Sequence, residues 1–286
     1  MKKLQSVFTK EYLAKLESLS FALKRKMGVE GYSGGRRSLA RGSSLEFSDF
    51  RDYIPGDDLR RVDWNSYARF GRLNTKLYFE EKQAEVNIFL DASRSMGSGG
   101  KFLQAKAMVA SLAYVALCDG ERVNVFVWNQ KIVLQKRNIV QKRALLQILQ
   151  LLEQAESGDE TDPTRAVLLS GQLGRGISVI VSDFLTENTP YDAVRVLQDK
   201  KQEVLLLQVI SKEEEKPEIS GTVRLTDSEN KEVRDIELTA MVLAAYEKAL
   251  KEHKSALANF CKSRGASFHT MSEDDNLFQQ VRQIVQ

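Results

Sequence analysis

Cysteine and histidine are scarce in this sequence, and their scarcity excludes several kinds of site. Only two cysteines, Cys118 and Cys261, and two histidines, His253 and His269, occur among the 286 residues. The cysteines lie far apart and form no CxxC pair, which argues against a thiolate zinc site or a disulfide framework. We expect both to be buried, reduced thiols in a cytosolic protein. Two histidines without a matching nucleophile give no basis for a Ser-His-Asp arrangement.

Long apolar runs and a strong excess of one charge are also lacking. No run approaches the roughly 18–20 apolar residues that a membrane-spanning helix needs. The basic start, Met1–Gln5, is soon interrupted by Lys10, Glu11 and Lys15, so no signal-peptide core follows it. The formal charge of +3 is small for this length and does not indicate a nucleic acid or a membrane surface as partner. We therefore expect a cytoplasmic protein without direct membrane insertion.

The first 84 residues differ from the rest in composition. Residues 1–28 place apolar side chains at intervals of three or four, which predicts a helix with one apolar face. Residues 36–82 are dense in arginine, aspartate and aromatic side chains and have no long periodic run. Because so many aromatics are atypical of a disordered linker, we expect an ordered, irregular layer pinned by ion pairs and packed on the domain that follows. Buried charges must be paired, which favours a structural role for segment 41–72, although its charges could also serve a partner surface.

From residue 85 onward, strand-like and helix-like patterns alternate. The apolar strand-like runs are 85–91, 122–128, 177–183, 203–210 and 266–271, with a shorter run at 131–134 that predicts an antiparallel edge strand. The helix-like runs are 101–118, 141–155, 163–173, 190–200, 239–264 and 274–285. The alternation predicts an α/β domain over 85–286, with a doubly wound, mostly parallel six-stranded sheet of order 3-2-1-4-5-6. A β-hairpin insertion is predicted at about 212–238, where two apolar runs flank a polar turn.

Polar side chains follow two of these strands where each strand ends. Strand 85–91 runs into Asp91-Ala92-Ser93-Arg94-Ser95, and a glycine-rich turn then leads into a helix. Strand 177–183 also ends in an aspartate, Asp183. In a sheet of this order the first and fourth strands are neighbours, and ligands bind at the switch point beyond their carboxyl ends. We therefore expect Asp91 and Asp183 to meet at one crevice.

A threonine is expected to join them. Asp162 and Pro163 predict a helix start with Asp162 as the cap, which leaves Thr161 just outside the helix N-terminus and able to face the crevice. Two serine hydroxyls, a threonine hydroxyl, two carboxylates and water suit Mg²⁺, or another divalent cation such as Mn²⁺ or Ca²⁺. With so few anionic ligands the bound cation keeps positive charge. An open position on it would attract a carboxylate from another protein.

These motifs resemble a known family. Asp91-x-Ser93-x-Ser95, with Thr161 and Asp183, resembles the metal-ion-dependent adhesion site of von Willebrand factor A domains, and residues 85–286 are similar to that fold in element order. The upstream segment resembles the signature of the bacterial domain of unknown function fifty-eight family, a von Willebrand factor A-like family. The stretches that carry this second resemblance are Arg41–Phe47, Asp49–Asp58, Leu59–Asn65, Ala68-Arg69 and Gly71-Arg72. Together the two resemblances cover nearly the whole chain.

The resemblance implies a function and a set of site residues. Members of the family are usually encoded beside MoxR-type AAA+ ATPases and are thought to act with them in chaperone-like assembly or maturation of client proteins. Thr161 is the weakest match, because Pro163 stands where the pattern commonly has an apolar residue, and Thr164 is the alternative. The implied function is a non-catalytic, metal-dependent interaction module that presents its site to an acidic residue of the ATPase or of its client. The metal ligands carried over are Asp91, Ser93, Ser95, Thr161 and Asp183.

Two other functions compete with this one. The first is a metal-dependent enzyme acting on phosphate esters, and Gly100-Lys101 invites comparison with a P-loop. The pattern G-x-x-x-x-G-K-[ST] fails, however, because Ser95 replaces its first glycine and Phe102 its magnesium-binding hydroxyl. Aspartates and magnesium would suffice for a phosphatase, but no clear general base is evident. The second is a structural scaffold with an empty metal site. We expect no catalytic residues and no organic cofactor.

Overall fold

The computed structural model describes residues 4–19, 46–79, 84–186, 188–217, 221–226 and 233–285. The chain divides into two compact units, one formed by residues 1–23 and 84–286 and the other by residues 24–83. The sequence-based division groups residues 1–84 together, whereas residues 1–23 here belong to the larger unit. The packing of the Arg/Asp-rich segment on the core stays a prediction.

A six-stranded sheet forms the centre of the larger unit. Its strands lie in the order β10-β7-β6-β3-β4-β5, with β5 antiparallel to β4 at one edge and all other neighbours parallel. The predicted α/β fold with a mostly parallel six-stranded sheet is confirmed. Because β3 and β6 are neighbours, the two aspartate-bearing strand ends lie side by side. The strands are β3 (Glu85–Asp91), β4 (Arg122–Trp128), β5 (Ile132–Ile139), β6 (Gly176–Ser182), β7 (Gln202–Ile210) and β10 (Ser267–Ser272).

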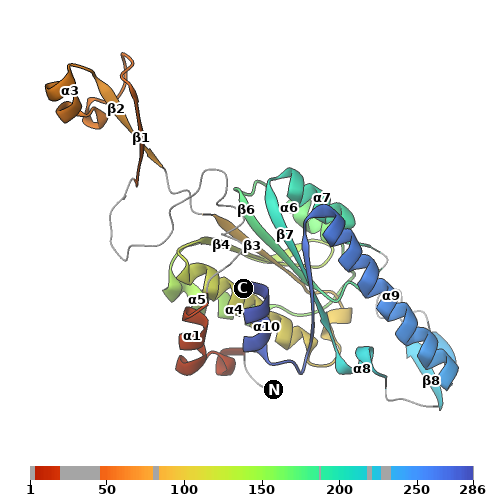
Figure 1. Cartoon of the computed structure of the whole chain (residues 1–286). Coiled ribbons are helices and arrows are strands. Elements are labelled where there is room, and N and C mark those ends of the chain that lie inside the picture. Colours follow the sequence, from red (N-terminus) through yellow and green to blue (C-terminus); the bar gives the residue numbers. More distant parts are fainter. Residues whose placement is uncertain are drawn as a thin grey trace. The chain divides into compact units, whose positions relative to one another are not determined.

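Helices cover both faces of this sheet (Figure 1). Alternate residues of a strand point to opposite faces, so Ile88 and Leu90 join one apolar cluster and Phe89 between them joins the other. The cluster of Ile88 includes residues of α1, α4, α5 and α10, and that of Phe89 includes residues of α6, α7 and α9. The helices are α1 (Lys10–Glu17), α4 (Lys101–Cys118), α5 (Leu145–Gln154), α6 (Pro163–Leu169), α7 (Tyr191–Asp199), α9 (Ala240–Arg264) and α10 (Leu277–Val285).

Helix α4 lies at the centre of one layer. By length and composition it is the one helix in the described part of the chain that could cross a membrane, but 78% of it is buried within the fold. It packs against β3 and β4 of the sheet and against α5 and α10. These contacts are those of a core helix in a doubly wound fold. The cytoplasmic location itself stays a prediction.

The N-terminal helix is shorter than the sequence predicts. Instead of one helix over 1–28, a 3-10 turn, Leu4–Val7, precedes α1. The side chain of Thr9 accepts a hydrogen bond from the Tyr12 amide at 3.2 Å and so begins a new helix. The predicted continuous helix is therefore wrong at its start, and residues 20–28 lie outside the described residues.

The predicted hairpin insertion is confirmed, and it begins with a helical turn. Strands β8 (Gly221–Thr226) and β9 (Val233–Leu238) pair in antiparallel fashion. Before them, α8 (Lys212–Glu215) replaces part of the predicted linker, because Ser211 and Glu214 form a capping box. The polar turn predicted at 227–230 lies outside the described residues.

The smaller unit is more regular than predicted. It contains an antiparallel strand pair, β1 (Glu46–Asp52) and β2 (Asn74–Phe79), and a short helix, α3 (Trp64–Phe70). The expected ion pairs are present: Arg51 contacts Asp57 at 2.6 Å and Lys76 contacts Asp63 at 3.5 Å. The prediction of an irregular layer was wrong because charged residues interrupt both strands and hide the alternation that marks a half-buried strand. Residues 41–45 of the family-like stretch lie outside the described residues.

Candidate functional site

The carboxyl ends of β3 and β6 bring the two predicted aspartates together. The parallel register pairs Leu90 with Val181, so Asp91 and Ser182 follow at the same level of the sheet. The Ser182 hydroxyl donates to Asp91 Oδ2 at 2.6 Å. Asp183 comes next in the chain, and its negative charge acts on Asp91. The sequence predicts this meeting of the two strand ends, but it does not single out Ser182.

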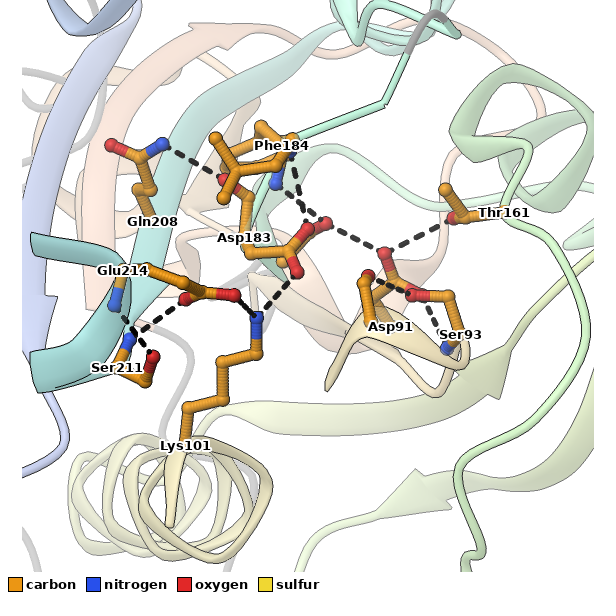
Figure 2. A network of polar contacts seen from close by, with 12 residues as sticks. Asp91, Ser93, Lys101, Thr161, Asp183, Phe184, Gln208, Ser211 and Glu214 are labelled. Atoms are coloured by element: carbon orange, nitrogen blue, oxygen red, sulfur yellow. Dashed lines mark hydrogen bonds and ion pairs between the residues drawn. The ribbon is translucent and has the colours of Figure 1, made fainter. Parts of the chain in front are cut away.

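Asp91 is a fully buried carboxylate held by neutral donors (Figure 2). Its Oδ1 accepts from the Ser93 amide at 2.8 Å, and its Oδ2 accepts from the Thr161 hydroxyl at 3.1 Å as well as from Ser182. Burial, and then the charge of Asp183, raise the pKa of Asp91 to about 7, although hydrogen bonds from Ser182 and Ser93 oppose the rise. In the described part of the chain, no cationic side chain forms an ion pair with it.

The predicted hydroxyls gather around Asp91. The Oγ atoms of Ser93 and Ser95 lie 3.1 Å apart. Thr161 is buried against Asp91, whereas Thr164 lies within α6, and the structure therefore places Thr161 rather than Thr164 beside the carboxylate. Of the five predicted ligands, Asp91, Ser93, Thr161 and Asp183 are buried and Ser95 alone keeps part of its surface exposed.

Two backbone contacts fix the loop that carries Thr161. The Gly158 amide donates to the carbonyl of Ala92 at 2.8 Å, and the Arg94 amide donates to the carbonyl of Asp159 at 2.9 Å. Asp162 then caps α6 by accepting from the Arg165 amide at 2.9 Å, as the sequence predicts. The loop after β3 and the loop before α6 are thereby held together.

Lys101 is the main feature that sequence reasoning missed. It begins α4, is fully buried, and places Nζ 2.8 Å from Asp183 Oδ2 and 2.5 Å from Glu214 Oε1 (Figure 2). Its ammonium group thus bonds to two carboxylates, which is not the role of a P-loop lysine. A lysine at the start of a mostly apolar core helix was the available signal, because a buried ammonium group requires an anionic partner.

The donor set fits a hard cation. Among the described residues, no three histidine, cysteine, aspartate or glutamate side chains cluster as a metal would need, so a cation here would depend on two carboxylates and the hydroxyls. Carboxylate and hydroxyl oxygens with water are typical ligands of Mg²⁺. A cation beside Asp91 would also supply the positive charge that this buried carboxylate lacks. Asp91, Ser93, Ser95 and Thr161 would hold it, with Asp183 close by.

Comparison with known proteins assigns the family. The family model described as "Protein of unknown function DUF58" matches residues 49–256. The chain belongs to the DUF58 family. Its relatives include uncharacterized proteins of Mycobacterium tuberculosis and Mycobacterium bovis, each 26% identical over 274 residues that cover 91% of this chain and 84% of the relative.

Solved structures resemble this DUF58 chain only distantly. BatB from Bacteroides thetaiotaomicron is 17% identical with a TM-score of 0.42, covering 71% of this chain and 97% of that one. An aerotolerance-related membrane protein from Bacteroides fragilis is 18% identical with a TM-score of 0.41, covering 70% and 96%. At these TM-scores the likeness carries no functional inference. The DUF58 match itself includes all five predicted ligands, and Lys101 and Glu214 as well.

Proposed function

We propose that this DUF58 protein is a non-catalytic protein-interaction module that depends on a divalent cation. One observation carries the proposal: Asp91, Ser93 and Thr161 converge at the end of β3, beside the carboxylate that follows β6. This convergence supports the resemblance of the sequence to the von Willebrand factor A adhesion site. We also propose that residues 85–286 adopt a von Willebrand factor A-like fold.

The ligand chemistry explains how such a site would bind a protein. Mg²⁺ held by few anionic ligands keeps positive charge, and the chemistry it supplies is the attraction of one further carboxylate oxygen. Ser95 is the one predicted ligand that keeps part of its surface exposed, and Arg94 beside it is exposed. An acidic side chain of the partner would therefore approach past the loop that follows β3.

The partner we propose is a MoxR-type AAA+ ATPase, or a client of that ATPase, as the family resemblance implies. The chain would orient the client while the ATPase supplies the energy for assembly or maturation. Neither a phosphate-ester enzyme nor an empty scaffold has a specific observation in its favour. The ammonium group of Lys101, the feature that invited the P-loop comparison, is bonded to Asp183 and Glu214.

Binding to the purified cognate ATPase tests this proposal. Wild-type protein on a resin should retain the ATPase in Mg²⁺, and retention should fall at least about tenfold in EDTA or with Asp91→Ala, because both remove the bridging cation. Asp192→Ala is the matched control, since Asp192 is an exposed aspartate that pairs with Arg195. Equal retention by all forms would contradict the proposal and move the interface to segment 41–72 or to the hairpin.

A further inference from the structure

Lys101 is an internal cation at the candidate site. Its Nζ is fully buried and contacts Asp183 at 2.8 Å and Glu214 at 2.5 Å. Burying an ammonium group is costly unless anions compensate it, and here two carboxylates do so. Figure 2 shows the side chain rising from α4 between these carboxylates, with Asp91 on the far side of Asp183. A divalent cation beside Asp91 would therefore lie close to a fixed positive charge.

Glu214, the second partner of Lys101, belongs to the hairpin insertion rather than to the sheet. It lies on α8, where its Oε2 accepts from the Ser211 amide at 2.9 Å. The Tyr246 hydroxyl of α9 donates to the Glu214 carbonyl at 2.6 Å, and Lys254 of α9 pairs with Glu215 at 3.3 Å. Since α8 precedes β8 and α9 follows β9, both ends of the hairpin are tied to the residue that bonds Lys101.

A second contact joins α9 to the strand end that carries Asp183. His253 Nε2–H donates to the carbonyl of Phe184 at 2.9 Å. Phe184 is buried and has φ +53°, a left-handed conformation that a bulky residue adopts only when its surroundings enforce it. The Phe184 amide also donates to Ser182 Oγ at 3.1 Å, which fixes its position. The insertion thus contacts the site through Glu214, and α9, which follows the insertion, contacts the residue after Asp183.

We propose that Lys101 and Glu214 set the cation affinity of the site and that α8 thereby couples the hairpin insertion to it. With α8 seated, Glu214 offsets the charge of Lys101 and the site accepts a divalent cation. When a partner displaces α8, Lys101 loses this compensation, pairs more closely with Asp183, and repels the cation. A protein that draws the hairpin away would therefore release the metal-dependent contact. This inference rests on the proposed metal site and adds its regulation.

The direction of the effect differs between two variants, and calorimetric titration with Mn²⁺ measures both. Lys101→Met removes the repelling charge and should tighten Mn²⁺ binding by about tenfold or more. Glu214→Gln leaves Lys101 without one of its anions and should weaken Mn²⁺ binding by about tenfold. Glu214 is partly exposed, so Glu214→Gln tests the coupling even where Lys101→Met folds poorly.

Two matched controls lie on the same elements. Glu213→Gln alters an exposed carboxylate of α8, and Lys248→Met alters an exposed lysine of α9 that pairs with Glu252, without touching Lys101. Both should leave Mn²⁺ affinity within about twofold of wild type, since neither residue contacts the candidate ligands.

The outcomes separate this inference from the proposed function. Tighter Mn²⁺ binding by Lys101→Met and weaker binding by Glu214→Gln, with unchanged controls, support both the proposed function and the role of Lys101 and Glu214. A wild type that binds Mn²⁺ with an affinity that neither variant changes overturns the role of Lys101 and Glu214 and leaves the metal site standing. Mn²⁺ binding by Lys101→Met alone supports the role of Lys101 as internal cation but contradicts the proposed function of the wild-type site. No binding by any form overturns both.

Discussion

Asp91→Asn is expected to weaken Mg²⁺ binding by roughly 100-fold or more, because it removes the central anionic ligand while keeping the shape of the side chain. Asp91 is the carboxylate around which Ser93, Thr161 and Ser182 are arranged. Isothermal titration of wild type and variant with Mg²⁺ measures the change. Asp192→Asn changes an exposed aspartate outside the site, and this variant should bind Mg²⁺ as wild type does. Equal affinity in Asp91→Asn would contradict the metal role of this residue.

The same variant has a second expected signature in metal-free protein. Burial raises the pKa of Asp91 from 3.8 to about 7, so the folded state disfavours its ionised form. The stability linked to its protonation is therefore present below about pH 4 and is lost as the pH rises through about 7. An amide side chain does not titrate, so Asp91→Asn should lack this loss in thermal unfolding between pH 5 and pH 8 (a range of about three pH units around the shifted pKa). A substitution that removes binding yet relieves instability would mark Asp91 as a functional residue rather than a structural one.

Lys101→Met is expected to lower the free energy of unfolding of the metal-free protein by roughly 3–5 kcal/mol. The change keeps the length of the side chain but leaves the Asp183 carboxylate buried without its cation, and Glu214 loses the same partner. Urea unfolding in EDTA measures the loss. Because a divalent cation can replace the missing charge, Mn²⁺ should restore more stability to Lys101→Met than to wild type.

Lys106→Met is the matched control for this loss. Lys106 lies on the same helix, but its Nζ donates to the carbonyl of Ala155 at 2.6 Å and forms no buried ion pair in the described residues. Its removal should cost about 1 kcal/mol, the usual value of such a hydrogen bond. A similar cost for Lys101→Met and Lys106→Met would show that the buried pair does not anchor α4.

The larger unit could be predicted from sequence because its elements follow simple periods. The β3 and β4 runs are mostly apolar, as is typical of strands buried on both faces, and their predicted limits match the structure. Other elements depend on side-chain hydrogen bonds, which the spacing of apolar residues in the sequence does not reveal. Thr9 interrupts the N-terminal helix by capping a new one, and Ser211 with Glu214 turns a charged linker into α8. In the smaller unit, charged residues conceal the strands β1 and β2.

The sequence predicts the residues of the candidate site that lie at or beside the ends of elements. It does not predict those that distant segments of the chain contribute. Asp91 and Asp183 follow from the sheet order, and Thr161 from the cap at Asp162. Lys101 could have been suspected as a charge on an apolar helix. Its partner Glu214 comes from an insertion more than a hundred residues away, and no spacing rule links the two.

Crystals grown with Mn²⁺ and measured for its anomalous scattering test the central claim most directly. We predict one strong peak within coordination distance of Asp91, Ser93 and Ser95, near Thr161, and its loss in crystals of Asp91→Asn. A peak at another place in the larger unit, or no peak at saturating Mn²⁺, would contradict the assignment of a metal site at the ends of β3 and β6.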